Sequence, residues 1–267
     1  MARKSALINA MELSARKAAR KLNRDFNEVE HLQVSRKGPA DFVSQADLTA
    51  EATLREELGR LRPDFGFILE EGGVVPSKDG IHSWVVDPLD GTTNFLHGLP
   101  HFAISIGVKA GKEIIAGIVL DTIRDELFWA EKGVGAYMNS RRLRVSNRKN
   151  MADCILATGI PFAGVADHDK FLKEAEAVME VSAGIRRFGV ASLDLAYVAA
   201  GRFDGFWERN LKEWDMAAGI IIAREAGAMV SQLDGGEKML EKGDILATAG
   251  GINKSMLDIF RKIRLGR

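Results

Sequence analysis

The stretch Trp84-Val85-Val86-Asp87-Pro88-Leu89-Asp90-Gly91-Thr92-Thr93-Asn94 joins a short apolar run to a turn that contains two aspartates. The apolar run predicts a buried strand, and Asp87 and Asp90 follow just beyond its end. Hard cations such as Mg²⁺ prefer oxygen ligands, and these two carboxylates with the Leu89 carbonyl between them can supply several. This stretch therefore predicts a metal site at the end of a strand.

The second part of the stretch has the residues of a phosphate-binding turn. Gly91 lets the backbone approach a bound group, and Thr92 and Thr93 favour the start of a helix, whose free N–H groups attract phosphate. Metal and phosphate would then share one turn. Asp-Pro and Asp-Gly are also ordinary turn formers, so the stretch taken alone is compatible with a solvent-exposed turn.

Two further acidic sites also lie at the ends of apolar runs. The run 65–69 leads into Glu70-Glu71-Gly72-Gly73, and Asp215 stands at the start of the apolar helix predicted over 216–223. Taken in isolation, Asp215 is better explained as an N-terminal helix cap. If the fold brings the three sites together, they form a cluster of like charges that only cations can neutralise.

The order and separation of these blocks resemble the inositol monophosphatase family, most closely its bacterial inositol-1-monophosphatase type, within the lithium-sensitive, Mg²⁺-dependent phosphatases. The resemblance covers nearly the whole chain. Leu69 and Gly72 depart from the residues that the family often has there, which leaves the acidic ligand Glu70 intact. The matching segments are Lys37, 41–47, 68–71, 84–95, 159–162, 192–202 and 214–219.

The resemblance implies a metal site and a mechanism. Water would be the nucleophile, and Thr92 would pair with Asp47 to orient and deprotonate it, with Glu70 assisting. For Asp47 the alternative is a cap for a helix that begins at Leu48. Two or three Mg²⁺ ions would be held by Glu70, Asp87, the Leu89 carbonyl, Asp90 and Asp215.

The resemblance also implies the substrate side of the site. Glu208 would accept hydrogen bonds from sugar or cyclitol hydroxyls, and the alternative is a surface carboxylate paired with Arg209 or Lys212. Arg187 is expected at this cavity or at a dimer interface, and Lys37 either balances the acidic cluster or is a solvated loop charge. The expected substrate-binding residues are Leu89, Asp90, Gly91, Thr92, Gly189, Val190, Ala191, Glu208 and Asp215.

The composition is that of a globular chain without a polycationic surface. The 267 residues carry 37 basic and 37 acidic side chains, which makes nucleic acid an unlikely partner class. The basic stretch 141–149 is expected to be a solvated hairpin face, and Cys154 a small buried residue. The N-terminus lacks the pattern of a secretory signal and no run is long enough to span a bilayer, so we expect a cytoplasmic protein.

The pattern of apolar residues divides the chain into two closely packed halves, 1–152 and 153–267. The first half predicts helices over 5–23 and 49–61, then strands over 83–86, 103–108, 114–120 and 126–130 in an antiparallel sheet. The second half predicts strand-like runs over 154–158, 185–188, 193–200, 205–208 and 229–232, alternating with helices over 170–180 and 216–226, an α/β pattern. With the family resemblance, this predicts a layered α-β-α-β-α sandwich whose second sheet is mixed and more parallel.

These observations predict a phosphomonoesterase that acts on inositol monophosphate. The alternatives are the same chemistry on fructose 1,6-bisphosphate or a nucleotide 3′-phosphate, and a regulatory binding protein that retains the fold. Lithium sensitivity and a homodimer are further expectations from the resemblance. The five histidines show no metal-binding spacing, and Trp129, Trp207 and Trp214 are expected to be packing residues.

Overall fold

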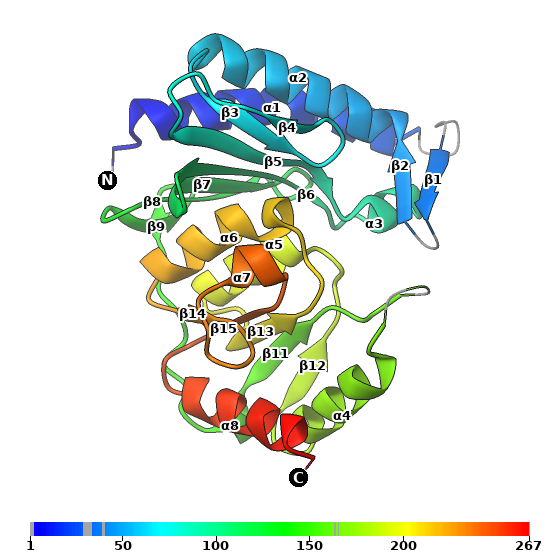
Figure 1. The fold of residues 1–267 in the computed structure, drawn as a ribbon, viewed down its shortest axis with the longest axis vertical. Coiled ribbons are helices and arrows are strands. Elements are labelled where there is room, and N and C mark those ends of the chain that lie inside the picture. Colours follow the sequence, from blue (N-terminus) through cyan, green and yellow to red (C-terminus); the bar gives the residue numbers. More distant parts are fainter. Residues whose placement is uncertain (1–2, 29–33, 39–40, 163, 165, 267) are drawn as a thin grey trace.

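The computed structural model describes the backbone of residues 3–28, 34–38, 41–162, 164 and 166–266, and their side chains except those of 34–43. Helices and sheets alternate in five layers in this part of the chain (Figure 1). This arrangement confirms the predicted α-β-α-β-α sandwich. The three helical layers are α1 (Ala6–Phe26) with α2 (Gln45–Leu61), α5 (Ala191–Ala199) with α6 (Glu213–Glu225), and α4 (His168–Met179) with α8 (Asn253–Arg264).

The larger sheet follows the two N-terminal helices. Its neighbouring strands are antiparallel except for β3 (Gly66–Leu69) and β5 (His82–Asp90), which run parallel. The predicted hairpin of β6 and β7 is confirmed. A small strand pair, β1 (Val34–Gly38) and β2 (Asp41–Ser44), stands apart from it, and helix α3 (Thr92–Leu96) follows β5. In spatial order the strands of the larger sheet are β10 (Arg141–Arg142), β9 (Gly135–Met138), β8 (Glu126–Glu131), β7 (Glu113–Asp121), β6 (Ala103–Ala110), β5 (His82–Asp90), β3 (Gly66–Leu69) and β4 (Gly73–Val75).

The smaller sheet is mixed, as predicted. β11 pairs in parallel with β12 and β13, whereas β15 pairs antiparallel with β13 and β14. A 3-10 helix, Met151–Asp153, leads into this half, and the short helix α7 (Met239–Lys242) precedes β15. The spatial order is β12 (Gly184–Arg186), β11 (Ile155–Thr158), β13 (Gly205–Glu208), β15 (Ile245–Thr248) and β14 (Met229–Ser231).

One element was predicted with the wrong type. The run 193–200, expected to be a strand, lies almost entirely in helix α5. Every residue of α5 is buried, because the helix lies between the two sheets and contacts other elements all round. A continuous apolar run has no period that distinguishes a buried strand from a buried helix, which is why the pattern failed here.

Helix α6 packs unusually close to the larger sheet. A Cβ added at Gly117 would lie 2.8 Å from the Ala218 Cα, and one added at Gly107 would lie 3.0 Å from the Ala217 Cβ. The glycines of β6 and β7 and the alanines of α6 therefore allow backbone to approach backbone. The buried core formed in this way is shared, since it joins Val85 of the larger sheet with residues of α5, α6 and the smaller sheet.

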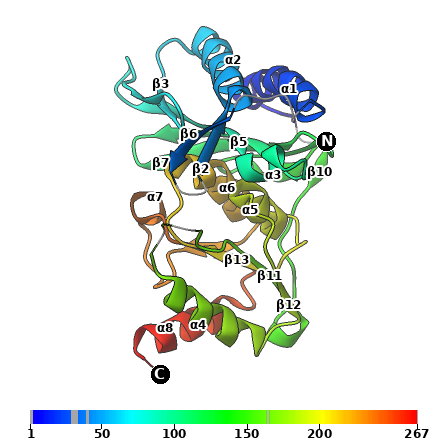
Figure 2. The ribbon, with the colours of Figure 1, turned by 90° about the vertical axis from the view of Figure 1, so that its right-hand side faces the viewer.

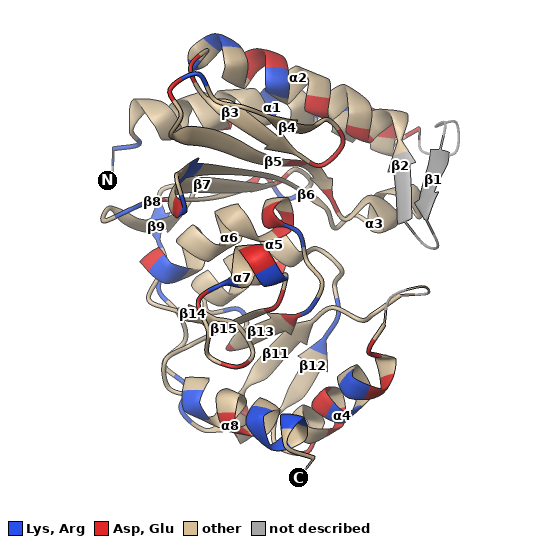
Figure 3. Ribbon diagram, in the orientation of Figure 1, with Lys and Arg blue, Asp and Glu red and all other residues tan. Residues whose placement is uncertain are grey.

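The outer surfaces carry mixed charge. Figure 2 shows α1 and α2 covering one side of the larger sheet and α4 and α8 lying at the opposite end of the molecule. On α2, α4 and α8 both acidic and basic residues are present, so none of these helices has a single sign of charge (Figure 3). No described helix is long and apolar enough to cross a membrane.

Candidate active site

Parallel strands β3 and β5 bring the first two acidic sites together. Leu69 pairs with Val86 in the register, so the residues that follow them, Glu70 and Asp87, leave the same edge of the sheet side by side. Side chains that follow neighbouring parallel strands must lie close to one another. The convergence that the sequence could only suggest is thus a consequence of this one parallel pairing.

The turn after β5 is built by its own polar groups. The register between β5 and β6 shifts between Asp87 and Asp90, where Pro88 has no N–H to give to the sheet. The Leu89 N–H donates instead to Asp87 Oδ1 at 2.9 Å. The Thr92 hydroxyl lies 3.1 Å from the Leu89 carbonyl oxygen, so the turn folds back on itself.

Asp90 points toward the start of helix α5. Its Oδ2 accepts a hydrogen bond from the Ser192 N–H at 2.7 Å. The N-cap residue of α5, Val190, has no side chain that can accept a hydrogen bond, so Asp90 supplies this capping contact from the other half of the chain. Gly91 has φ of 99°, and a Cβ there would lie 2.8 Å from Val190 Cγ2, so only glycine fits.

Asp215 lies in the first turn of α6. The N-cap is Lys212, so Asp215 is not the cap residue itself. Its carboxylate, at the third helical position, accepts a hydrogen bond from the Lys212 N–H at 2.7 Å. The Ser105 hydroxyl donates to the Trp214 carbonyl at 3.2 Å. Because Ser105 also pairs with Asp87 across β5 and β6, it links the two acidic sites.

The acidic side chains interact electrostatically. Burial raises the pKa of Asp87 well above its usual range, and the charges of Glu70, Asp90 and Asp215 raise it further. Burial likewise raises the pKa of Asp90 to about 6. Burial, with the charge of Asp90, raises the pKa of Asp215 to about 8. A bound cation would reverse all of these shifts.

The cluster has the donor chemistry of a Mg²⁺ site. The candidate ligands are oxygens from carboxylates and one backbone carbonyl, which would suit a hard cation. The described residues include no group of three or more His, Cys, Asp or Glu side chains that is already arranged to hold a metal ion. The four carboxylates are electrostatic neighbours.

Thr92 and Asp47 form the expected pair. The Thr92 hydroxyl lies 2.9 Å from Asp47 Oδ1. The other oxygen of Asp47 accepts the N–H and the hydroxyl of Ser44, the N-cap of α2. Burial raises the pKa of Asp47, although these hydrogen bonds act in the opposite direction. Asp47 is therefore not the cap of a helix that begins at Leu48, because α2 begins at Gln45; it completes the capping box of Ser44 and is also the partner of Thr92.

Glu208 faces the cavity and not the surface. Burial, with the charge of Asp90, raises its pKa to about 8. Its carboxylate lies against Gly159 so closely that a Cβ there would overlap it. The alternative pairing with Arg209 is wrong, because the described structure pairs Arg209 with Glu174 and Asp244.

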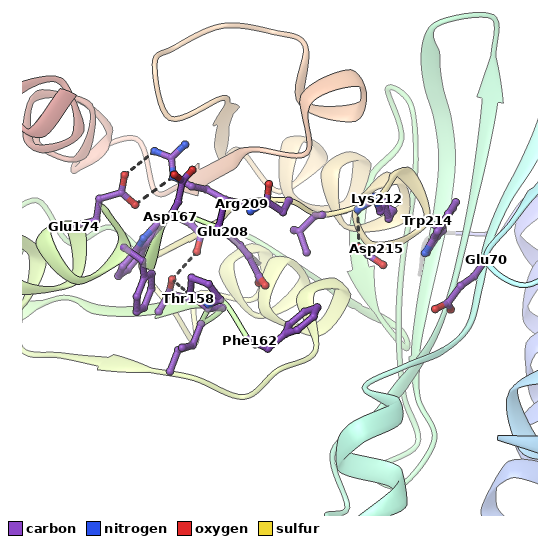
Figure 4. A pocket seen from close by; sticks show the side chains of 18 residues that line it. Glu70, Thr158, Phe162, Asp167, Glu174, Glu208, Arg209, Lys212, Trp214 and Asp215 are labelled. Atoms are coloured by element: carbon purple, nitrogen blue, oxygen red, sulfur yellow. Dashed lines mark hydrogen bonds and ion pairs between the residues drawn. The ribbon is translucent and has the colours of Figure 1, made fainter. Parts of the chain in front are cut away.

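The cavity beside the acidic cluster has a volume of about 370 Å³ and reaches from Glu70 and Asp215 to Glu174 and Arg209. In Figure 4, Glu70 and Asp215 lie at one end and the Glu174–Arg209 pair at the other, with Glu208 between. This size is within the range of small-molecule sites. The geometry thus combines a cation-seeking cluster with room for an organic group.

Some expectations for single residues had other outcomes. Trp129 and Trp207 are buried as expected, whereas Trp214 is half-buried and lines the cavity. Arg187 is exposed, with its guanidinium against Gly189. The side chain of Lys37 lies outside the described residues.

Three supporting residues were missed. Glu51 accepts the Glu71 N–H at 2.8 Å, and Ser105 holds the Trp214 carbonyl. Asp194 is buried on α5, its carboxylate oxygens have no hydrogen-bond partner among the described residues, and burial raises its pKa well above the usual range. The sequence signal for Asp194 was only that an acidic residue lies within an apolar run.

Known proteins resemble the chain along nearly all of its length. The model of the inositol monophosphatase family matches residues 3–264. Inositol-1-monophosphatase of Rhizobium meliloti (strain 1021) is 54% identical over 259 residues, 97% of each chain. Nus factor SuhB of Pseudomonas aeruginosa is 44% identical over 245 residues, 90% of each chain. The crystal structure of extragenic suppressor protein suhB from Bartonella henselae matches with a TM-score of 0.94 and 51% identity, covering 97% of this chain and 99% of that one.

Proposed function

Because the chain belongs to the inositol monophosphatase family, a family of phosphatases, we propose that it is a Mg²⁺-dependent enzyme that hydrolyses inositol monophosphate to inositol and phosphate. The bond from phosphorus to the alcohol oxygen breaks, a bond from phosphorus to a water oxygen forms, and the alcohol takes up a proton. The observation that carries the proposal is that Glu70 and Asp87 follow paired positions of β3 and β5, beside a cavity that Glu70 and Asp215 line.

The metal ligands would be Glu70, Asp87, the Leu89 carbonyl, Asp90 and Asp215. Two or three bound Mg²⁺ ions would polarise the phosphoryl oxygens, lower the pKa of a bound water and neutralise the leaving alkoxide. The protein's own part is to hold these oxygens on turns fixed by backbone hydrogen bonds, as at Leu89, Ser192 and Lys212.

Proton removal from the water falls to Thr92 and Asp47. When the Thr92 hydroxyl donates its proton to a hydrogen bond with Asp47, the lone pairs of the Thr92 oxygen are available to accept a proton from water. Burial raises the pKa of Asp47, which makes this carboxylate a better base. Glu70 would assist.

Glu208 and the turn Gly189-Val190-Ala191 would contact the alcohol. A carboxylate that accepts hydrogen bonds from hydroxyls favours a polyol over an apolar alcohol at this position. The substrate would also contact Leu89, Gly91 and Thr92 of the phosphate turn.

A regulatory binding role is the second candidate function. A relative with 44% identity is named a Nus factor, and this favours a regulatory binding role as the alternative. Such a role requires no turnover, whereas the intact acidic cluster supports catalysis.

Phosphate release tests the proposal. The panel is inositol 1-phosphate, fructose 1,6-bisphosphate and adenosine 3′-phosphate, each with Mg²⁺ and with EDTA. We expect the highest kcat/KM for inositol 1-phosphate and activity only with Mg²⁺. Preference for another ester would change the substrate, and no turnover of any would favour the binding role.

Asp90→Asn is the matched variant. It keeps an oxygen that can accept the Ser192 N–H but loses the charge. We expect a loss of kcat of more than about 100-fold, since even outer-shell partners of a metal contribute roughly 10–100-fold. A folded, fully active variant would contradict the ligand role.

Lithium inhibition and a homodimer belong to the same proposal as family properties, and a cytoplasmic location belongs to it as an expectation from the sequence. Full activity at high lithium would remove the first. A monomer by light scattering would remove the second without affecting the chemistry.

A further inference from the structure

The cavity has two ends of different chemistry. The end at Glu70 and Asp215 is acidic and suits cations with a phosphate (Figure 4). Between the two ends the walls carry large apolar side chains, among them Ile160, Phe162 and Phe171. Inositol carries a hydroxyl on every ring carbon, so it has no apolar group to place against this wall.

The apolar wall is accessible. Ile160 and Phe162 are each 47% exposed, although both are large apolar residues next to a charged site. Exposed apolar surface at a concave site is typical of a surface that is covered by a ligand. Aromatic rings such as Phe162 contribute large contact areas and prefer planar partners.

The guanidinium of Arg209, at the second end of the cavity, is already neutralised. Arg209 Nη2 lies 2.6 Å from Oε1 of the buried Glu174, and Arg209 Nη1 lies 3.0 Å from Asp244 Oδ2. A guanidinium held on two sides by carboxylates is a poor ligand for a further anion. The far end of the cavity therefore suits an uncharged group and not a second phosphate.

We propose that the apolar wall of this cavity is a leaving-group subsite, formed by Ile160, Phe162, Phe171 and Leu211. It binds an apolar or aromatic substituent on the hydroxylated alcohol of a phosphomonoester. The inference rests on the proposed function, because the phosphate of the same molecule must lie at Glu70 and Asp215. The preferred substrates are then polyol monophosphates that carry such a substituent.

Two esters with the same reacting alcohol isolate this subsite. Methyl β-D-glucopyranoside 6-phosphate and phenyl β-D-glucopyranoside 6-phosphate lose phosphate from the same primary hydroxyl and differ only at the far end. Their intrinsic reactivity is therefore equal. We expect kcat/KM to be about tenfold higher for the phenyl ester, because a few added carbons in an apolar pocket give roughly 10- to 200-fold discrimination.

The variant Phe162→Ala tests the location. We expect the ratio of the two kcat/KM values to fall to near one in this variant. The ratio is measured within one protein preparation, so a general loss of activity cancels. Leu172→Ala is the matched control, because Leu172 is 61% exposed on α4 and does not line the cavity. The control should keep the wild-type ratio.

The outcomes separate the two proposals. If inositol 1-phosphate is hydrolysed but the phenyl ester has no advantage, or neither glucoside reacts, the apolar subsite is wrong and the proposed function stands. If the advantage persists in Phe162→Ala, the subsite as defined is wrong. If inositol 1-phosphate itself is not hydrolysed with Mg²⁺, the proposed function fails, and the subsite with it.

Discussion

The side chain of Asp47 has two roles: it completes the capping box at the start of α2 and it pairs with Thr92. Its Oδ2 accepts the hydrogen bonds of Ser44 that begin helix α2, and its Oδ1 is left for Thr92. The helix cap fixes the carboxylate, and a fixed carboxylate holds the threonine hydroxyl in one direction. A structural role at this position therefore supports the catalytic role that we propose.

Replacing Thr92 tests the proton relay. Thr92→Ala removes the hydroxyl between water and Asp47, so we expect kcat to fall by about 10²–10⁴-fold, the usual contribution of general acid–base catalysis. KM should change little, because the metal and phosphate ligands remain. Steady-state phosphate release measures both constants.

The neighbouring threonine is the control for this variant. Thr93 is exposed and lies outside the pair, so Thr93→Ala should keep the wild-type kcat. Thr92→Ser, which retains a hydroxyl, should recover most of the activity. Equal kcat for Thr92→Ala and the wild type would show that the hydroxyl takes no part in the reaction.

At the residue scale the sequence predicted the charged members of the site better than their supports. Glu70, Asp87, Asp90 and Asp215 stand at the ends of apolar runs, which a pattern can reveal. Ser105 carries no such signal, since its importance comes from a register with Asp87 and a contact with the distant Trp214. Long-range contacts of this kind have no local pattern.

At the scale of elements, boundaries depended on short polar signals. Helix α2 begins at Gln45, four residues before the predicted start at Thr49, because Ser44 and Asp47 form a capping box. The early turn buries only Ala46 and Ala50 as apolar residues, and such small side chains give a weak helical period. Of the predicted strands of the larger sheet, 83–86 is part of the much longer β5 (His82–Asp90), whereas those over 103–108, 114–120 and 126–130 needed only short extensions.

Helix α2 also supports the Glu70 loop. Glu51 lies one turn after Asp47, so both side chains lie on the same face of the helix. Its Oε2 accepts the Glu71 N–H at 2.8 Å, and a Cβ at Gly72 would lie 2.9 Å from its Oε1. One helix face thus positions both the base and the loop that carries Glu70.

Removing this support should weaken metal use before it affects the fold. We expect Glu51→Ala to raise the Mg²⁺ concentration for half-maximal activity by about 10–100-fold, the usual effect of losing an outer-shell partner. Glu51→Gln should have a smaller effect, because its amide oxygen can still accept the N–H. Activity titrated with Mg²⁺ gives the value for each variant.

Glu56→Ala on the same helix is the control, since Glu56 is exposed. It should keep the wild-type Mg²⁺ requirement. If Glu51→Ala lowers thermal stability but leaves the Mg²⁺ requirement unchanged, Glu51 is a packing residue only.

At the scale of the whole molecule, the site lies where the two halves of the chain meet. The division into halves stays a prediction, but the site residues belong to turns that contact each other across it. Neither half contains all of the proposed ligands. The hydrogen bonds that span the junction near the site include those from the Ser192 N–H to Asp90, from the Ser105 hydroxyl to the Trp214 carbonyl, and from Asn94 Nδ2 to the Phe188 carbonyl.

The acidic cluster makes stability depend on pH. In the folded chain the pKa is about 6 for Asp90 and about 8 for Asp215 and Glu208, against 3.8 and 4.5 for ordinary Asp and Glu. The folded state therefore holds more protons than the unfolded state between these values. Stability from these groups is complete below about pH 4 and is lost as pH rises through about pH 8.

Thermal unfolding tests this dependence. In EDTA we expect Tm to fall by several degrees between pH 5 and pH 8, since about 1 kcal/mol corresponds to roughly 2–4 °C for a chain of this size. Mg²⁺ should raise Tm more at pH 8 than at pH 5, because only the ionised carboxylates bind it. Asp258→Asn, on the exposed end of the molecule, should follow the wild type, whereas Asp90→Asn should show a smaller Mg²⁺ effect. A Tm in EDTA that rises with pH would contradict the raised pKa values of these carboxylates. It would mean that they ionise in the folded state without mutual repulsion, so that a bound cation would have little repulsion to relieve.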